Sequence, residues 1–75
     1  MRAEIRGVEV RYTVERGLEV EDVVTQERII AYAQPLVMVG ANPCLVIEEY
    51  VRTHGGEVIE PCSEAEIEAG IERVK

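Results

Sequence analysis

No phenylalanine or tryptophan is available to build the core of this chain, whose aromatic residues are Tyr12, Tyr32 and Tyr50. The core must come mainly from valine and isoleucine, which bury less area per residue than aromatic side chains do. A domain of 75 residues buries only about 60% of the surface that its unfolded chain exposes. Domains this small usually depend on a disulfide, a metal or oligomerisation. We therefore expect one domain, residues 1–75, that forms a homo-oligomer.

The charge of the chain excludes several partners. The formal net charge is −7, and lysine and arginine form no cluster. This balance argues against nucleic acids and anionic membranes. No apolar run approaches the roughly 20 residues that cross a bilayer, and Glu4 and Arg6 interrupt any signal-peptide pattern. We therefore expect a cytoplasmic protein with neither a nucleic-acid nor a membrane partner.

The types of charged and amide residues indicate the kind of organism from which the protein comes. Asp22 is the only aspartate among many glutamates, and Asn42 is the only asparagine. Abundant ion-pairing charges with few thermolabile amides are typical of proteins from thermophiles. We therefore expect a thermophilic source.

The N-terminal residues alternate between apolar and polar side chains. Val8–Val14 has the period of a half-buried strand, whereas Ala3 and Ile5 are out of phase with it. The phase changes at Arg6-Gly7, which predicts a turn or bulge there. We therefore expect an antiparallel hairpin of Met1–Ile5 with Val8–Val14.

The segment Leu18–Gln34 has two interpretations. Acids such as Asp22 near a helix start favour a helix through about Ala31. The β-branched residues favour two strands instead, Leu18–Val20 and Arg28–Ala33. We favour the helix and keep the strands as the alternative.

The next residues predict a strand, a helix and a second strand. Leu36–Val39 is wholly apolar, as in a strand covered on both faces. Asn42 is a good N-cap for a helix over Pro43–His54, because proline suits the first helical position. Gly55-Gly56 should end this helix, and Glu57–Glu60 should form a short strand.

Ser63 and Glu66 have the spacing of a capping box, which predicts a last helix over Glu64–Val74. The expected fold is therefore α/β or α+β, with a small single sheet of about four strands. An N-terminal antiparallel hairpin is followed by a β-α-β-α unit, which gives two or three helices in all.

Cys44 and Cys62 occupy similar positions, each after an apolar strand and at the start of a helix. If those strands are parallel neighbours, both thiols lie at the sheet edge where open α/β sheets bind ligands. A helix N-terminus also lowers the pKa of a thiol such as that of Cys44. The pair is thus a candidate disulfide, redox pair or half of a site for zinc or another thiophilic metal. The competing interpretation, which we favour for Cys44, is a small buried apolar residue.

His54 is excluded from such a metal site. It lies ten residues beyond Cys44 on the predicted helix, so the two side chains are roughly 15 Å apart. Zinc ligands lie at about 2.0–2.3 Å from the metal. His54 is better interpreted as a hydrogen-bonding residue at a helix C-terminus.

A candidate anion site precedes the same helix. Gly40, Ala41 and Asn42 lead into one helix N-terminus, and Ser63 leads into a second. The loop lacks the dinucleotide glycine pattern and the Walker lysine. An ordinary connection is therefore the alternative to a site for a small anion or nucleotide.

Residues for conventional catalysis are scarce, since Ser63 and His54 are the only serine and histidine. We therefore predict no catalytic residues and lean against an enzyme. The leading expectation is a non-enzymatic binding or accessory module that works as a homo-oligomer or as a subunit of a larger assembly. The alternative is a thiol- or metal-dependent redox or carrier protein that uses Cys44 and Cys62. The third is an anion or nucleotide binder at Gly40–Asn42.

Overall fold

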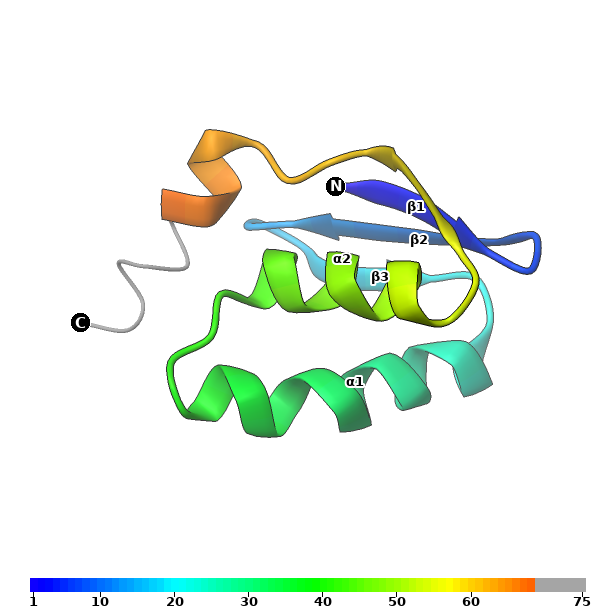
Figure 1. Ribbon diagram of the computed structural model, residues 1–75, viewed down its shortest axis with the longest axis horizontal. Coiled ribbons are helices and arrows are strands. Elements are labelled where there is room, and N and C mark those ends of the chain that lie inside the picture. Colours follow the sequence, from blue (N-terminus) through cyan, green and yellow to red (C-terminus); the bar gives the residue numbers. More distant parts are fainter. Residues whose placement is uncertain (69–75) are drawn as a thin grey trace.

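The fold is α+β, with a four-stranded antiparallel sheet of order β3-β2-β1-β4 and helices packed on one face (Figure 1). The computed structural model describes residues 1–68. Its elements are β1 (Arg2–Ile5), β2 (Val8–Thr13), β3 (Gly17–Val20), α1 (Val23–Met38), α2 (Pro43–Thr53) and β4 (Glu57–Glu60). A third helix begins at Glu64. The expected sheet size and fold class are confirmed.

The N-terminal hairpin is also confirmed. Ile5 pairs with Val8, so Arg6 and Gly7 form a two-residue turn. Both turn residues have positive φ, 50° at Arg6 and 79° at Gly7. Turns of this kind follow the right-handed twist of the strands that they join.

The core lies between one face of the sheet and the helices. Its fully buried side chains are small or β-branched: Val10 from β2, Ile29 from α1, and Cys44 and Val51 from α2. Tyr12 and Tyr50 are the large buried residues beside them. The alternation along β2 leaves Arg11 exposed on the other side of the sheet.

The segment Leu18–Gln34 contains one part of each predicted interpretation. Leu18 pairs with Tyr12, so the short strand is real. The second predicted strand, Arg28–Ala33, is wrong because these residues belong to α1. Asp22 is the N-cap of α1, and its Oδ2 accepts the Thr25 backbone N–H at 3.0 Å.

The predicted strand Leu36–Val39 is wrong. Helix α1 continues through Pro35 to Met38, and Val39 is its C-cap. Proline removes one hydrogen bond from a helix. Ala33 and Val37, however, lie on either side of Pro35 and line a groove with Leu18 and Ile47. Helix α1 contacts both β3 and α2, and the apolar residues after Pro35 continue this helix rather than starting a strand.

This correction changes the topology. The first strand of the predicted β-α-β-α unit does not exist, and the parallel strand pair does not form. The last strand, β4, pairs antiparallel with β1 instead, as in Ala3 with Val58. The sheet therefore has no parallel edge of the kind at which the two cysteines were placed.

The predicted helix over Pro43–His54 is confirmed to within one residue. Asn42 caps it, with Oδ1 accepting the Leu45 N–H at 3.1 Å. His54 is the C-cap, and Gly55 follows with φ of 76°. The last helix begins after the predicted capping box, because Glu66 N–H donates to Ser63 Oγ at 3.2 Å. The part of that predicted helix beyond residue 68 lies outside the described residues.

Candidate functional site

The two predicted site cysteines meet in a disulfide. Cys44 and Cys62 are joined, with their Cα atoms 6.1 Å apart. Cys44 is fully buried in the first turn of α2, and Cys62 is half-buried in the segment after β4. The bridge thus ties the start of α2 to the segment that leads into the last helix.

The cysteines meet for a different reason from the predicted one. Helix α2 carries the chain roughly 16 Å in one direction. Strand β4 follows after Gly55-Gly56 and covers roughly 13 Å. The chain returns along α2, which β4 contacts, so Cys62 arrives beside the helix start where Cys44 lies (Figure 1).

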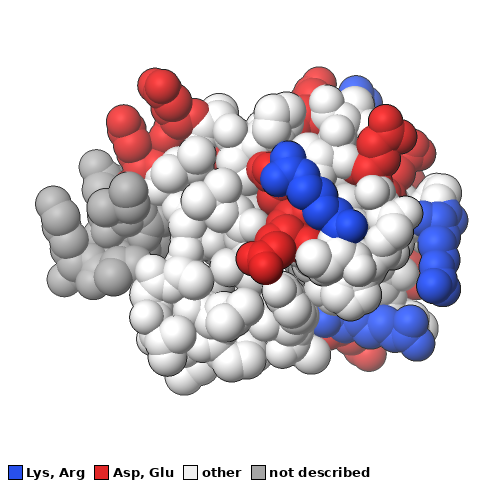
Figure 2. Space-filling view, viewed as in Figure 1, with Lys and Arg blue, Asp and Glu red and all other residues white. Residues whose placement is uncertain are grey.

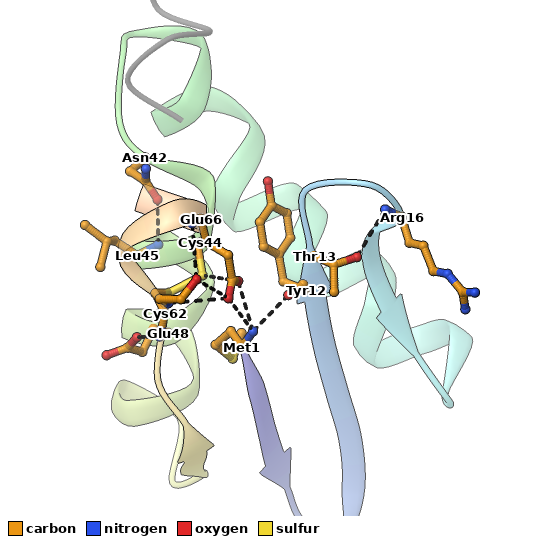
Figure 3. A network of polar contacts seen from close by, with 11 residues as sticks. Met1, Tyr12, Thr13, Arg16, Asn42, Cys44, Leu45, Glu48, Cys62 and Glu66 are labelled. Carbon is orange, nitrogen blue, oxygen red and sulfur yellow. Dashed lines mark hydrogen bonds and ion pairs between the residues drawn. A yellow bond between two sulfur atoms is a disulfide. The ribbon is translucent and has the colours of Figure 1, made fainter. Parts of the chain in front are cut away.

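Glu66 lies against this disulfide and against the amino terminus of the chain (Figure 3). Its Oε2 is 3.3 Å from the Cys44 Sγ and 2.9 Å from the Met1 amino nitrogen. Met1 is a buried residue, 8% exposed, and its amino group also donates to the Tyr12 carbonyl oxygen at 2.9 Å. One carboxylate therefore neutralises a buried ammonium next to the disulfide.

The pKa of Glu66 is lowered from its usual value of 4.5. Burial by itself raises this pKa, but hydrogen bonds from the Met1 ammonium and from the Ser63 backbone N–H and hydroxyl outweigh it. The side chain is 15% exposed. Glu66 is therefore held as a carboxylate in the folded protein.

Glu48 supports the disulfide from the other side. Its side chain is 8% exposed, and its Oε2 accepts the Cys62 backbone N–H at 3.1 Å. Its Oε1 lies 2.6 Å from the Arg52 guanidinium, an ion pair between residues four apart on α2. Both cysteine segments are thus fixed by side chains that are themselves anchored.

The chemistry of this site follows from these contacts. Both sulfurs are in the disulfide, so no thiol is available as a nucleophile or metal ligand until the bond is reduced. Within residues 1–68, no group of three or more metal-ligating side chains is found. The arrangement can act as a covalent support or, after reduction, as a dithiol.

The residues of the predicted anion site are also brought together. The Asn42 side chain donates from Nδ2 to the Ile67 carbonyl oxygen at 2.8 Å, so it joins the α1–α2 connection to the last helix. The Ser63 hydroxyl donates to Glu66 Oε1 at 3.1 Å. Gly40, with φ of 103°, ends the last turn of α1 and is followed by the half-buried Ala41. Anion binding at these residues stays a prediction.

His54 lies at the far end of α2 from the disulfide. Its Nδ1 lies 2.8 Å from the Tyr50 carbonyl oxygen, which agrees with a hydrogen-bonding role at a helix C-terminus. The residue is exposed. Its ring stacks on that of Tyr50 with centroids 3.8 Å apart.

An uncharged surface, which the sequence interpretation missed, covers the end of α1. Figure 2 shows no charged side chain over the C-terminal half of α1 and the α1–α2 connection. Met38 is 78% exposed and Val39 is 83% exposed. Beside them lies a shallow apolar groove of about 230 Å³, whose lining includes Leu18, Ile30 and Val37. We call the surface formed by Leu18, Ile30, Leu36, Val37, Met38 and Val39 the uncharged face.

A signal for this surface is present in the sequence. Residues 29–47 contain no charged side chain, although 31% of the whole chain is charged. A helix that is apolar on more than one side has either two packing partners or an exposed apolar face. Treating Leu36–Val39 as a buried strand hid that exposed face.

Comparisons with protein-family models, curated proteins and solved structures find no match for this chain. Across the described residues, no helix has the length and apolar character needed to cross a membrane.

Proposed function

We propose that this protein is a non-enzymatic interaction module that forms a homodimer through the uncharged face. The observation that carries the proposal is the exposure of Met38 and Val39, 78% and 83%, beside an apolar groove. Burying one large apolar side chain contributes about 1.5–3 kcal/mol. Leaving several of them in water is costly unless a partner covers them.

A second copy of this chain is the partner that the shape and charge favour. The exposed Met38 borders a groove that Leu18 and Ile30 also line, and the exposed Val39 follows it in the chain. A two-fold axis through such a surface lets each copy place its Met38 in the groove of the other. Two molecules of charge −7 repel each other, and this surface is where they can meet without opposing carboxylates.

A dimer would need only a small part of the surface of each copy. A standard interface buries about 800 Å² per partner, which is about a sixth of the 4967 Å² that one copy exposes. Pairing through the open edge of β3 is less favourable. An antiparallel β3 pair would place the Glu19 side chains of two copies near each other, and like charges across strands destabilise a sheet.

Sedimentation equilibrium with two charge variants tests the proposal. Wild-type protein should show twice the 8.4 kDa mass of one chain, and Met38→Glu should show a single chain. Val23→Glu is the control, because Val23 is 67% exposed on the same helix but lies at its other end. It should leave the dimer intact. A wild-type mass of one chain at submillimolar concentration would reject the proposal.

A redox or carrier function of Cys44 and Cys62 is the alternative, and the disulfide between them supports it. We favour a structural role because Cys44 is fully buried and the Cys62 backbone N–H is held by the Glu48 carboxylate. Structural disulfides have reduction potentials below about −300 mV, whereas catalytic ones are less negative. A potential in the glutathione range would favour the redox alternative, and stoichiometric zinc in the reduced protein would favour the metal alternative.

The remaining expectations from composition stay predictions: a cytoplasmic location, a thermophilic source, subunit assembly in a larger complex and no nucleic-acid binding. The first two are linked, because intracellular disulfides are rare except in hyperthermophiles. A mobility-shift assay at physiological salt should show no complex with nucleic acid. A protein with a net charge of −7 neutralises few phosphates, so its binding would release few counterions.

A further inference from the structure

We propose that a cavity at the C-terminal end of α2, away from the disulfide, binds a small organic acid. The cavity has a volume of about 450 Å³, which is within the range of small-molecule sites. It is formed where the β1–β2 turn, the start of α1 and the end of α2 meet. The proposal does not depend on the dimer.

Two arginines give the cavity its charge. Arg6 comes from the β1–β2 turn and Arg28 from α1, and both line the cavity. Among the described residues, neither forms an ion pair with a carboxylate within 4.0 Å. Figure 2 shows arginine side chains at this end of a molecule that is otherwise rich in acids. Two guanidinium groups at one cavity favour an oxyanion, either carboxylate or phosphate.

The other walls suit an apolar or aromatic body on the ligand. Ile5, Val8 and Val24 supply apolar surface. Tyr50 and His54 supply stacked rings. Because the Tyr50 carbonyl oxygen can only accept, His54 Nδ1 is the donor in their contact, and Nε2 of the neutral ring can accept a hydrogen bond from a hydroxyl group on the ligand.

Asp22 is the acid in the described lining, and its carboxylate already has partners. Its Oδ2 accepts the Thr25 N–H at 3.0 Å and the Thr25 hydroxyl at 2.7 Å. The two arginines therefore outnumber one carboxylate that is committed to capping α1. The lining has a net positive charge in a protein of charge −7.

The backbone at Arg6 supports a functional role for its side chain. Its φ of 50° lies in the left-handed region, which asparagine and glycine adopt more easily than arginine. Asn-Gly is the preferred sequence for a two-residue turn of this type. Arginine at this position is therefore unfavourable for the turn, whereas its charge is useful to the cavity.

Titration by NMR with benzoate and phenyl phosphate tests the proposal, with benzyl alcohol as the uncharged probe. We expect at least one acid to shift the ring resonances of Tyr50 and His54, and benzyl alcohol to shift them far less. Stronger binding of phenyl phosphate would identify phosphate as the group recognised, and stronger binding of benzoate would identify carboxylate. No shift with either acid at millimolar concentration would overturn the proposal.

Three variants that each remove one arginine charge separate this site from general attraction of anions. Arg28→Gln and Arg6→Asn should each weaken binding by about tenfold, the loss of one charge-assisted hydrogen bond. Arg16→Gln, in the exposed β2–β3 turn outside the cavity, should weaken it less than about twofold. Arg6→Asn should also keep or raise the melting temperature, so lost binding cannot be attributed to unfolding. Equal weakening by all three variants would overturn the proposal.

Discussion

Glu66 joins three parts of the molecule. Its carboxylate accepts hydrogen bonds from the Met1 ammonium and the Ser63 hydroxyl, and it lies 3.3 Å from the Cys44 sulfur. Its charge matters because the ammonium belongs to a buried residue, only 8% exposed. A buried charge that loses its partner is destabilising, even where the pair itself contributes little net free energy. The free energy of unfolding should therefore depend on the protonation of this one residue.

Glu66→Gln should lower the free energy of unfolding at neutral pH by about 2 kcal/mol, the cost of losing hydrogen bonds to a charged group. Glu64→Gln is the matched control, because Glu64 is exposed in the same helix and the charge change is equal. Urea unfolding of protein that retains Met1 measures the free energy of unfolding of both variants. Equal losses for the two variants would show that the buried ion pair contributes nothing specific.

The lowered pKa of Glu66 also predicts a pH dependence. A carboxyl group whose folded pKa lies below its unfolded value stabilises the fold above the unfolded value. For Glu66 this contribution should be complete above pH 4.5 and be lost as the pH falls through the lower, folded pKa. Stability measured between pH 5 and pH 2 should therefore decrease more in the wild type than in Glu66→Gln. Parallel curves would contradict this.

Gly55 and Gly56 are adjacent, but replacing each with alanine should lower the free energy of unfolding by a different amount. A Cβ atom at Gly56 would lie 2.6 Å from the Glu4 carbonyl oxygen and 2.8 Å from a carbon of Val51, so backbone must move. At Gly55 the space is open, and only the φ of 76° is unfavourable. Gly56→Ala should cost about 3 kcal/mol and Gly55→Ala about 1 kcal/mol. Thermal unfolding shows which of the two variants is less stable. A less stable Gly55→Ala variant would contradict the close packing of β1 against Gly56.

The elements that were predictable from sequence are those fixed by neighbours in the chain. Asn42 and Ser63 were predicted as caps because each bonds a residue three positions later. The hairpin followed from the phase change at Arg6-Gly7. In each case the determining interaction spans only a few residues.

The elements that were missed are fixed by contacts far apart in sequence. Leu36–Val39 has the composition of a strand, but it forms the end of a helix that contacts β3 and α2. The cysteine pair was a sound candidate, although the parallel strands assumed for it do not exist. The cavity of Arg6 and Arg28 required three elements to meet, which no spacing in the sequence reveals.

The disulfide should contribute to stability as a link between α2 and the segment after β4. The disulfide closes a loop with a sequence separation of 18. A disulfide that closes a loop of this length stabilises the folded protein by about 3 kcal/mol. Reduction should lower the free energy of unfolding by this amount, measured in urea with and without dithiothreitol. The double variant Cys44→Ala/Cys62→Ala should be insensitive to the reductant. An unchanged wild-type midpoint on full reduction would show that the bond is not a structural support.

At the scale of the whole molecule, charge is separated from apolar surface. The acids and arginines lie over the sheet, the start of α1, the end of α2 and the helix that begins at Glu64, whereas the C-terminal half of α1 is uncharged (Figure 2). A small core without phenylalanine or tryptophan gains little stability from burial alone. Covering the uncharged face in a dimer would add the apolar burial that one copy cannot supply.

The most direct test of this account is an intermolecular NOE from the Met38 methyl group. Met1 and Met38 are the only methionines, so methyl-¹³C-methionine labelling gives one signal on the uncharged face and one in the core. In a mixture of labelled and unlabelled chains, the account predicts filtered NOEs from Met38 to Leu18 or Ile30 of the other copy, and none from Met1. The measurement is made at a concentration above which the chemical shift of the Met38 methyl group no longer changes. The absence of intermolecular NOEs from this methyl group would then contradict the dimer.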